Sequence, residues 1–236
     1  MERFSNRFGE LLVGEFSSGR SPCVVLLHGF SAYKNFGVVN ELFLSFSDTG
    51  RSVFRFDFSG NGESEGLFGD STFSKQAKEV VDVLDYLERE FSVTEVVLVG
   101  HSMGGAVALL AAGDARVQSV VCLAGAVLPQ QDIARRPERF FAGNELSVPH
   151  VKGVTLPKRE YVISEQWIAD AKRVDPLGAF PDKPVLAVHG SGDVHVLLDS
   201  SRALEALGAR LVVLETDHFF SGVTQELSLL LEEFIS

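Results

Sequence analysis

The chain is poor in cysteine and has no long apolar run. Of its 236 residues 2 are cysteines, Cys23 and Cys122, and both lie in apolar segments where a free thiol acts as a small buried hydrophobe. A disulfide framework is therefore excluded, and a reducing compartment, most simply the cytoplasm, is expected. The N-terminal segment Met1–Arg7 lacks the apolar core of a signal peptide. No run approaches the ~20 apolar residues that span a bilayer, so no membrane span is predicted.

Basic residues are also scarce. The chain has 21 Lys and Arg against 32 Asp and Glu, a net charge of −11, so it lacks the basic stripe that a nucleic-acid partner requires. No His, Cys or Asp cluster has the spacing of zinc ligands, so neither a metal nor a cofactor is predicted. Hydrophobic residues make up 45% of the chain, which is enough to form a core that needs neither disulfide bonds nor a bound metal.

Apolar segments alternate with helical patterns along the chain. Most of these segments are continuously apolar, which is typical of strands covered on both faces. The expected strands are Leu11–Phe16, Cys23–His28, Ser52–Asp57, Glu95–Val99, Val117–Ala124, Val185–His189 and Ala209–Leu214. Helical patterns are expected over residues 77–91, 41–46, 201–207 and 225–235. The alternation predicts an α/β fold with a mostly parallel, doubly wound sheet.

One long segment, residues 129–176, interrupts this alternation. Long insertions in compact folds are usually lids or binding loops, so we expect it to form a small inserted cap over a core built from residues 1–128 and 177–236. Val151–Thr155 and Arg159–Ile163 flank Leu156-Pro157-Lys158, a pattern that predicts a small hairpin.

The pentapeptide Gly100-His101-Ser102-Met103-Gly104 follows the apolar run Glu95–Val99 and precedes an alanine-rich helical segment. A G-x-S-x-G sequence between a strand and a helix is the pattern of a nucleophile elbow, in which a sharp turn exposes one serine hydroxyl. Ser102 is therefore the candidate nucleophile.

A serine hydroxyl needs a base, and the base needs a carboxylate that fixes its tautomer. Of the six histidines, His218 follows the last expected strand, at the sheet edge where the serine is presented. Asp193 follows the preceding strand in Gly190-Ser191-Gly192-Asp193, and it is the candidate acid. The backbone N–H groups of Phe30 and Met103 are the candidate oxyanion hole, because one follows the first core strand and the other follows the nucleophile.

The order Ser102, Asp193, His218, with His28-Gly29 upstream, resembles the α/β-hydrolase fold. The segment from Asp57 to Ser64 is similar to that family's D-x-x-G-x-G-x-S turn, which implies a structural role for Asp57. Within the superfamily the chain looks most like small feruloyl (cinnamoyl) esterases, whose matching stretches are His28-Gly29-Phe30, Arg55 to Gly66, Lys183-Pro184-Val185-Leu186 and Asp217-His218.

These residues predict a cofactor-free serine carboxylesterase that acts on a small-molecule ester. The resemblance to feruloyl esterases implies aromatic acyl groups such as feruloyl as candidate substrates. His195 is expected to line the site, and Tyr161 and Trp167 of the cap are candidates for contact with the acyl group. Three alternatives stay open: a serine peptidase of aminopeptidase type, a short-acyl lipase or thioesterase, and a non-catalytic binding module on the same fold. The cap arginines Arg135, Arg136 and Arg139 could anchor a peptide terminus in the first of these.

Overall fold

The computed structural model describes residues 1–149, 151–152 and 154–236. Its strands are β1 (Glu2–Ser5), β2 (Leu11–Ser17), β3 (Arg20–Leu27), β4 (Arg51–Asp57), β5 (Val96–His101), β6 (Val117–Leu123), β7 (Val185–Gly190) and β8 (Arg210–Leu214). Its helices are α1 (Gly37–Asp48), α2 (Phe73–Phe91), α3 (Met103–Ala111), α4 (Pro129–Arg135), α5 (Glu165–Arg173), α6 (Leu198–Ala206) and α7 (Thr224–Ile235), with a 3₁₀ turn, η1, at Phe68–Asp70. The expected strands and helices are all present, with their ends shifted by a few residues.

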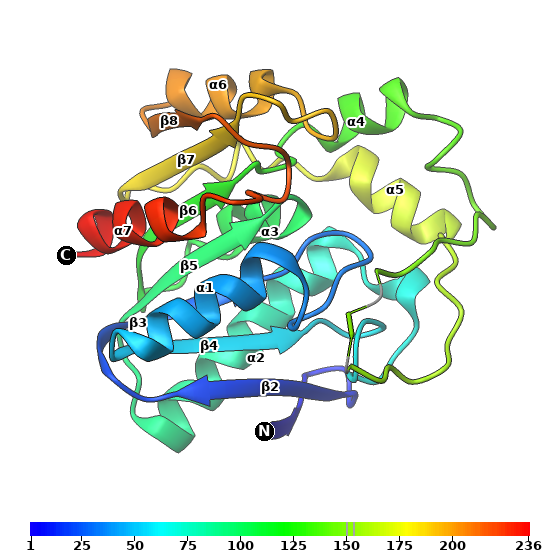
Figure 1. The fold of residues 1–236 in the computed structure, drawn as a ribbon. Helices are drawn as coiled ribbons and strands as arrows, with labels where there is room; N and C mark the ends of the chain where they lie inside the picture. Colours follow the sequence, from blue (N-terminus) through cyan, green and yellow to red (C-terminus); the bar gives the residue numbers. More distant parts are fainter. Residues whose placement is uncertain (150, 153) are drawn as a thin grey trace.

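The strands of the described residues form one eight-stranded sheet in the order β1-β2-β4-β3-β5-β6-β7-β8. The pairs β1–β2 and β2–β4 are antiparallel, and the other five pairs are parallel. The predicted α/β fold with a mostly parallel sheet is therefore confirmed (Figure 1). The sequence did not predict β1, because only Phe4 of this short strand is buried and no apolar run marks it.

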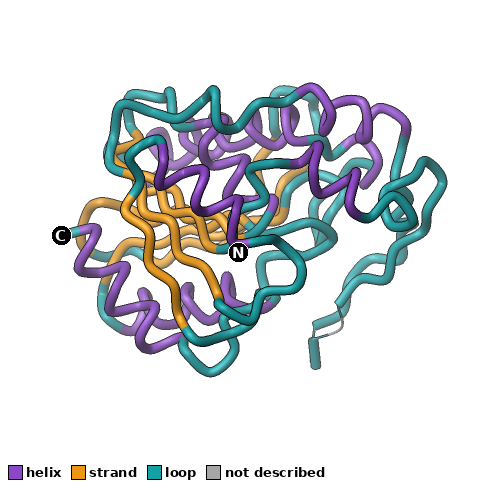
Figure 2. The backbone as a smooth tube through the Cα atoms, turned by 90° about the horizontal axis from the view of Figure 1, so that it is seen from above, coloured by secondary structure: helices purple, strands orange, loops and turns teal. Residues whose placement is uncertain are grey.

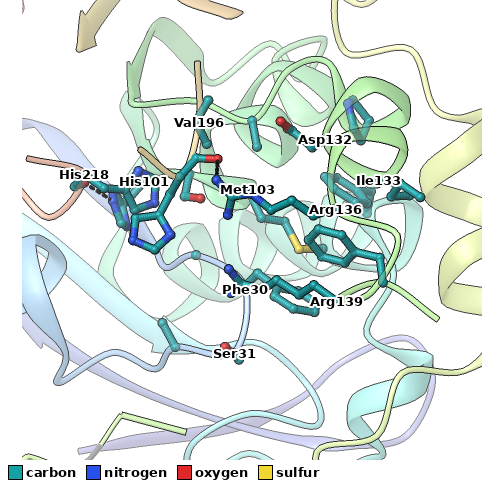
Figure 3. Close-up of a pocket in the computed structure, with 18 of the residues that line it drawn as sticks. Phe30, Ser31, His101, Met103, Asp132, Ile133, Arg136, Arg139, Val196 and His218 are labelled. Atoms are coloured by element: carbon teal, nitrogen blue, oxygen red, sulfur yellow. Dashed lines mark hydrogen bonds between the residues drawn. The ribbon is translucent and has the colours of Figure 1, made fainter. Parts of the chain in front are cut away.

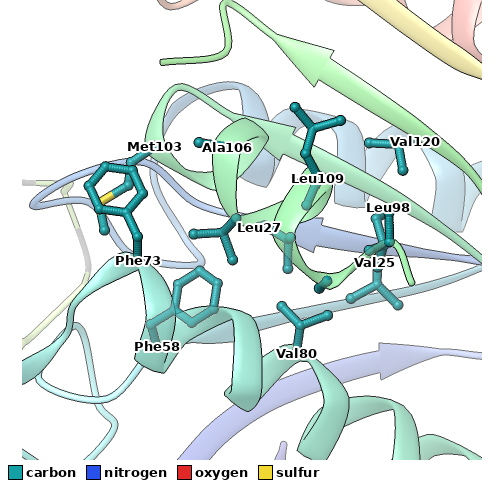
Figure 4. Close-up of a cluster of buried hydrophobic side chains, with 14 of the residues drawn as sticks. Val25, Leu27, Phe58, Phe73, Val80, Leu98, Met103, Ala106, Leu109 and Val120 are labelled. Carbon is teal, nitrogen blue, oxygen red and sulfur yellow. The ribbon is translucent and has the colours of Figure 1, made fainter. Parts of the chain in front are cut away.

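Helices cover both faces of the sheet (Figures 1 and 2). α1 and α7 pack against one face, and α2 and α3 against the other. In β5, Val97 and Val99 belong to the cluster under α1 and α7, whereas Val96 and Leu98 belong to the opposite cluster, part of which Figure 4 shows. Burial on both faces is the reason that these strands are continuously apolar. No helix among the described residues is long and apolar enough to cross a membrane.

The segment between β6 and β7 contains α4 and α5, which contact each other beyond the carboxyl ends of the parallel strands (Figure 1). The hairpin predicted within this segment is wrong for the residues that the structure describes. Tyr161 and Ile163 instead exchange backbone hydrogen bonds with residues 143–146, among them Leu146 N–H to Tyr161 C=O at 2.8 Å. A single antiparallel bridge joins Glu145 to Val162.

This pairing follows from burial. Tyr161 and Ile163 are 6% and 0% exposed and belong to the main core cluster, which holds their strand-like segment against the body of the protein. Residues 151 and 152, the described start of the other expected hairpin strand, have no such anchor, and His150 and Gly153 lie outside the described residues.

Asp57, at the end of β4, anchors the loop that follows β3. One carboxylate oxygen accepts the backbone N–H of Lys34 at 2.6 Å, and the other accepts the Lys34 ammonium at 2.8 Å and the backbone N–H of Glu63 at 2.9 Å. A Cβ on Gly62 would lie 2.2 Å from the Asp57 carboxyl carbon, so the turn requires glycine there. Asp57 thus has the structural role that the family resemblance implied.

Glu79 of α2 is a fully buried carboxyl group. Its oxygens accept the side-chain amide N–H of Asn6 at 2.9 Å and the backbone N–H of Ser59 at 3.1 Å. Burial outweighs these hydrogen bonds and raises the pKa of Glu79 from 4.5 to about 7. The folded chain therefore binds more protons here than the unfolded chain, and stability present below pH 4.5 is lost as the pH rises through about 7.

We expect Glu79→Gln to remove this part of the pH dependence, because the amide has no proton to lose. The shift corresponds to about 3 kcal/mol between the two limits. The measurement is the free energy of unfolding in urea at about pH 5 and about pH 8, for the wild type and for Glu79→Gln. Glu90→Gln, on the exposed end of the same helix, is the control variant. Identical pH slopes in the wild type and Glu79→Gln would contradict the assignment.

Candidate active site

Ser102 lies in the sharp turn between β5 and α3. Its φ of 54° and ψ of −119° are unusual for a residue other than glycine and cost backbone energy that the surrounding structure must offset. A Cβ on Gly100 would lie 2.1 Å from the carbonyl oxygen of Gly104, and one on Gly104 would lie 2.4 Å from that of Leu27. The close approach of strand and helix therefore requires both glycines of the pentapeptide.

Asp193 and His218 are hydrogen-bonded to each other. The loop after β7 carries Asp193 and the loop after β8 carries His218, and Oδ2 of the aspartate lies 2.7 Å from Nδ1 of the histidine. The other carboxylate oxygen accepts the backbone N–H groups of His195 at 2.7 Å and Val196 at 2.9 Å. Although burial acts to raise it, the pKa of Asp193 stays below its usual value because of these hydrogen bonds and the adjacent His218.

The Asp193–His218 hydrogen bond sets the tautomer of His218. A carboxylate only accepts hydrogen bonds, so the proton of a neutral His218 ring lies on Nδ1. Nε2 then keeps a free electron pair that can accept a proton. Nε2 of His218 therefore has the free electron pair that a general base requires.

His101, inside the pentapeptide, holds the backbone of His218. Its Nε2 lies 2.9 Å from the carbonyl oxygen of His218, and the two rings lie 4.8 Å apart between centroids. A carbonyl only accepts, so Nε2 must carry the proton. Burial, followed by the nearby His218, lowers the pKa of His101 to about 3 and keeps the ring neutral. The sequence offered no signal for this role, since the contact joins residues 117 positions apart.

The loop that carries Phe30 packs against the serine. A Cβ on Gly29 would lie 3.1 Å from Cβ of Ser102, so a side chain there would push the loop away from the turn. Met103 is the first residue of α3, and the first N–H groups of a helix have no partner within it. Phe30 and Met103 both line the same cavity as Ser102.

This cavity has a volume of about 250 Å³. Ser102, His218 and His195 line it from the core. Figure 3 shows His218 on the same side of the cavity as His101. Part of its wall is aromatic and is formed by the side chains of Phe30, Phe73, Phe140 and Trp167. The ring of Phe30 lies 4.8 Å from that of Trp167 and 5.6 Å from that of Phe140, between centroids. Arg135, Arg136 and Arg139 contribute a basic part of the same wall.

The other candidate residues divide between the cavity and the core. His195 and Trp167 line the cavity, and the His195 ring lies 5.0 Å from the His218 ring between centroids. Tyr161 is not among the described residues that line it. Its ring lies 5.2 Å from that of Phe68, and its side chain belongs to the core cluster. The pairing of its segment with residues 143–146 directs the Tyr161 side chain into the core, and its contact with a substrate stays a prediction.

Two other strand-end histidines are structural. His28 accepts the backbone N–H of Phe58 at Nε2, and its Nδ1 lies 2.9 Å from the carbonyl oxygen of Gly29. His189 contacts the hydroxyl of Ser201 at 2.8 Å. Burial lowers the pKa of both rings, which keeps them neutral. Within the described parts of the chain, no group of three or more His, Cys, Asp and Glu side chains could hold a metal ion.

The sheet order, the helices on both faces and the turn at Ser102 are those of the α/β-hydrolase fold. A family model described as "Serine aminopeptidase, S33" matches residues 20–188, more than half of the chain. The chain belongs to this family. The match ends before Asp193 and His218, so it covers the turn at Ser102 but not the proposed acid and base.

Two relatives illustrate the range of the sequence matches. Human mitochondrial palmitoyl-protein thioesterase ABHD10 is 34% identical over 107 residues, which cover 45% of this chain and 33% of the thioesterase. The dihydrolipoyllysine-residue acetyltransferase component of the acetoin cleaving system from Pseudomonas putida is 27% identical, over 91% of this chain and 58% of its own length. The matches thus span between a third and three fifths of these longer proteins.

Solved structures match over nearly the whole chain. Est1E from Butyrivibrio proteoclasticus with ferulic acid bound has a TM-score of 0.82 at 21% identity, covering 99% of this chain and 97% of Est1E. Mouse ABHD10 has a TM-score of 0.78 at 21% identity, covering 99% of this chain and 97% of its own. At this level of identity the likeness establishes the fold.

Proposed function

We propose that this protein is a serine hydrolase that cleaves small carboxylic esters through an acyl-enzyme. The hydrogen bond between Asp193 and His218, beside a cavity that Ser102 also lines, is the observation that carries the proposal. In this assignment Ser102 is the nucleophile, His218 the general base and acid, and Asp193 the group that orients His218. The N–H groups of Phe30 and Met103 stabilise the oxyanion.

The reaction has two halves with the same proton carrier. Nε2 of His218 takes the hydroxyl proton of Ser102 as Oγ attacks the ester carbonyl, and the carbonyl electrons move to the oxygen. The tetrahedral intermediate collapses, and His218 gives that proton to the departing alcohol. Water then attacks the acyl-enzyme, with its proton passing to His218 and back to Oγ. The products are the free acid and the unmodified serine.

The cavity favours a small substrate. Ligand pockets usually enclose roughly 300–1,000 Å³, and this one, at about 250 Å³, lies just below that range. Its aromatic wall suits a flat acyl group, and Est1E, which has a similar fold, binds ferulic acid. We further propose that residues 129–176 act as a cap, since α4, Phe140 and Trp167 on this segment line the cavity together with Ser102.

Thioesters are the second candidate substrates. The proposed chemistry transfers an acyl group to Ser102 and is indifferent to whether oxygen or sulfur departs. The observation that favours them is the 34% identity to ABHD10, whose description is palmitoyl-protein thioesterase, over 107 residues.

The test compares initial hydrolysis rates of p-nitrophenyl butyrate, methyl ferulate and the neutral thioester S-butyryl-N-acetylcysteamine. We expect turnover of the butyrate ester, and faster cleavage of the ferulate if the aromatic wall holds the acyl group. Labelling with a fluorophosphonate, followed by intact mass, should add one adduct per chain. A protein that neither cleaves any of the three nor reacts with the fluorophosphonate would be a non-catalytic binding module.

A further inference from the structure

The cavity has a basic wall, in a protein with a net charge of −11. Arg135 and Arg136 lie at the end of α4 and just beyond it, and Arg139 follows in the next turn of chain. All three line the cavity, and among the described lining residues Asp132 is the only carboxylate. The cavity wall therefore carries more positive than negative charge, opposite in sign to the protein as a whole.

Two of these arginines already have partners. Arg135 donates to the carbonyl oxygen of His195 at 2.6 Å and lies 3.6 Å from Asp132. Arg136 donates to the carbonyl oxygens of His195, at 2.7 Å, and of Val194. They brace the loop that follows Asp193 and so help to hold the acid in position.

Arg139 is different. Among the described residues, its guanidinium has neither a carboxylate within salt-bridge distance nor a hydrogen-bond acceptor. It lies 5.6 Å from the centre of the Phe140 ring, on the aromatic wall of the cavity. Burial, followed by the charge of Arg136, lowers the pKa of Arg139, as expected of a cation without a counter-charge.

The half-buried Arg139 guanidinium has donors that no acceptor among the described residues engages, and such planar donors match a carboxylate in a bidentate arrangement. We propose that Arg139 binds a carboxylate group on the substrate, so that the preferred substrates are esters that also carry a negative charge. This inference rests on the proposed ester hydrolysis at Ser102 and names the substrate class for that site. The carboxylate can belong to the acyl part, as in a hemiester of a dicarboxylic acid, or to the alcohol part.

Two matched substrate pairs distinguish these sources. Monoethyl adipate and its neutral amide, ethyl adipamate, place the charge on the acyl side. Para-carboxyphenyl butyrate and para-carbamoylphenyl butyrate place it on the leaving group. For each pair the quantity measured is the ratio of kcat/KM for the charged ester to that for the neutral one.

We expect the wild type to prefer the charged member of one pair. Arg139→Gln should lower that ratio by about 10- to 100-fold, the worth of one charge-assisted interaction, and Arg139→Lys should restore part of it. Arg202→Gln, on the exposed surface of α6, is the matched control and should leave the ratio unchanged. Calorimetric titration with adipate dianion provides a readout without turnover, and Arg139→Gln should weaken that binding by a similar factor.

The outcomes separate the two proposals. Equal ratios in the wild type and Arg139→Gln for both pairs, with the neutral esters still cleaved, would overturn the role of Arg139 and leave ester hydrolysis standing. Absence of cleavage for every ester would overturn the proposed function, and adipate binding that depends on Arg139 would then still support an anion site. Adipate binding of equal strength in the wild type and Arg139→Gln would count against the site in either case.

Discussion

Replacing Ser102 with alanine is expected to lower the turnover number for p-nitrophenyl butyrate by about 10⁴-fold or more. The substitution removes the oxygen that we propose forms the acyl-enzyme, and the proposed pair of Asp193 and His218 then has no nucleophile to activate. Activity that remains would come from the oxyanion hole and from binding, which act without the serine. The fluorophosphonate adduct should also disappear, since the same oxygen forms it.

The substitution should leave the fold intact. The side chain of Ser102 makes no capping hydrogen bond at the start of α3, and alanine keeps the Cβ that the backbone at φ 54° already accommodates. Thermal unfolding and circular dichroism should match the wild type, and Ser5→Ala on the exposed edge strand β1 serves as the matched control. Turnover within tenfold of the wild type would contradict the assignment of Ser102.

The sequence predicted the core of the fold well because most strands that are covered on both faces are continuously apolar. The first four residues of β5 are the clearest instance: successive side chains from Val96 to Val99 enter two hydrophobic clusters in turn, so no polar position interrupts this run. β1 lacks this signal, since it lies at the sheet edge and buries only Phe4. Its place in the sheet depends on pairing with β2, which a local pattern does not reveal.

In the inserted segment the local signal was misleading. Leu156-Pro157-Lys158 has the composition of a turn between two β-prone segments, which is the pattern of a hairpin. In the structure, however, Tyr161–Ile163 pairs with residues 143–146. Two aromatic residues of this segment were equivalent candidates from sequence, and the structure separates them: Trp167 lines the cavity and Tyr161 packs in the core. Which side chain faces a cavity depends on how the segments pair in the tertiary structure, and composition and periodicity do not predict that pairing.

The candidate site shows the same division. The positions of Ser102, Asp193 and His218 after their strands follow from the rule that parallel strands present their loops at one edge. The contacts that hold these three residues in position do not follow from this rule. The contact of His101 with the His218 carbonyl joins distant residues, and the donation from Arg136 to the loop after Asp193 joins the inserted segment to the core. Both contacts are consequences of the tertiary fold and leave no local pattern in the sequence.

Replacing Asp193 with asparagine is expected to lower the turnover number by about 10⁴-fold while leaving the serine in place. Oδ1 of Asp193 accepts two backbone N–H groups, from His195 and Val196, so the oxygen of an asparagine must occupy that position. The amide nitrogen then takes the place of Oδ2, which lies 2.7 Å from Nδ1 of His218. Because an amide nitrogen donates, Nδ1 must become the acceptor and the ring proton must move to Nε2.

A His218 ring protonated at Nε2 cannot take the proton of Ser102, and this is the reason for the loss. The ¹⁵N chemical shifts of the imidazole report the tautomer directly and should show the proton on Nδ1 in the wild type and on Nε2 in Asp193→Asn. Asp199→Asn, on the exposed first turn of α6, is the matched control and should retain wild-type turnover. Loss of activity with an unchanged tautomer would show that Asp193 acts on stability or loop structure, and turnover close to the wild type would remove it from the site.

The asparagine variant should also alter the pH dependence of stability in a defined direction. Hydrogen bonds hold the pKa of Asp193 below its usual value, so its ionised form stabilises the fold above the unfolded pKa, and this contribution is lost as the pH falls through the lower, folded value. Asp193→Asn has no such proton to bind. The difference in unfolding free energy between the variant and the wild type should therefore be largest near neutral pH and shrink in acid, opposite in sense to the effect of Glu79→Gln. A difference that is independent of pH would mean that the carboxylate gains nothing from His218 and the two backbone N–H groups.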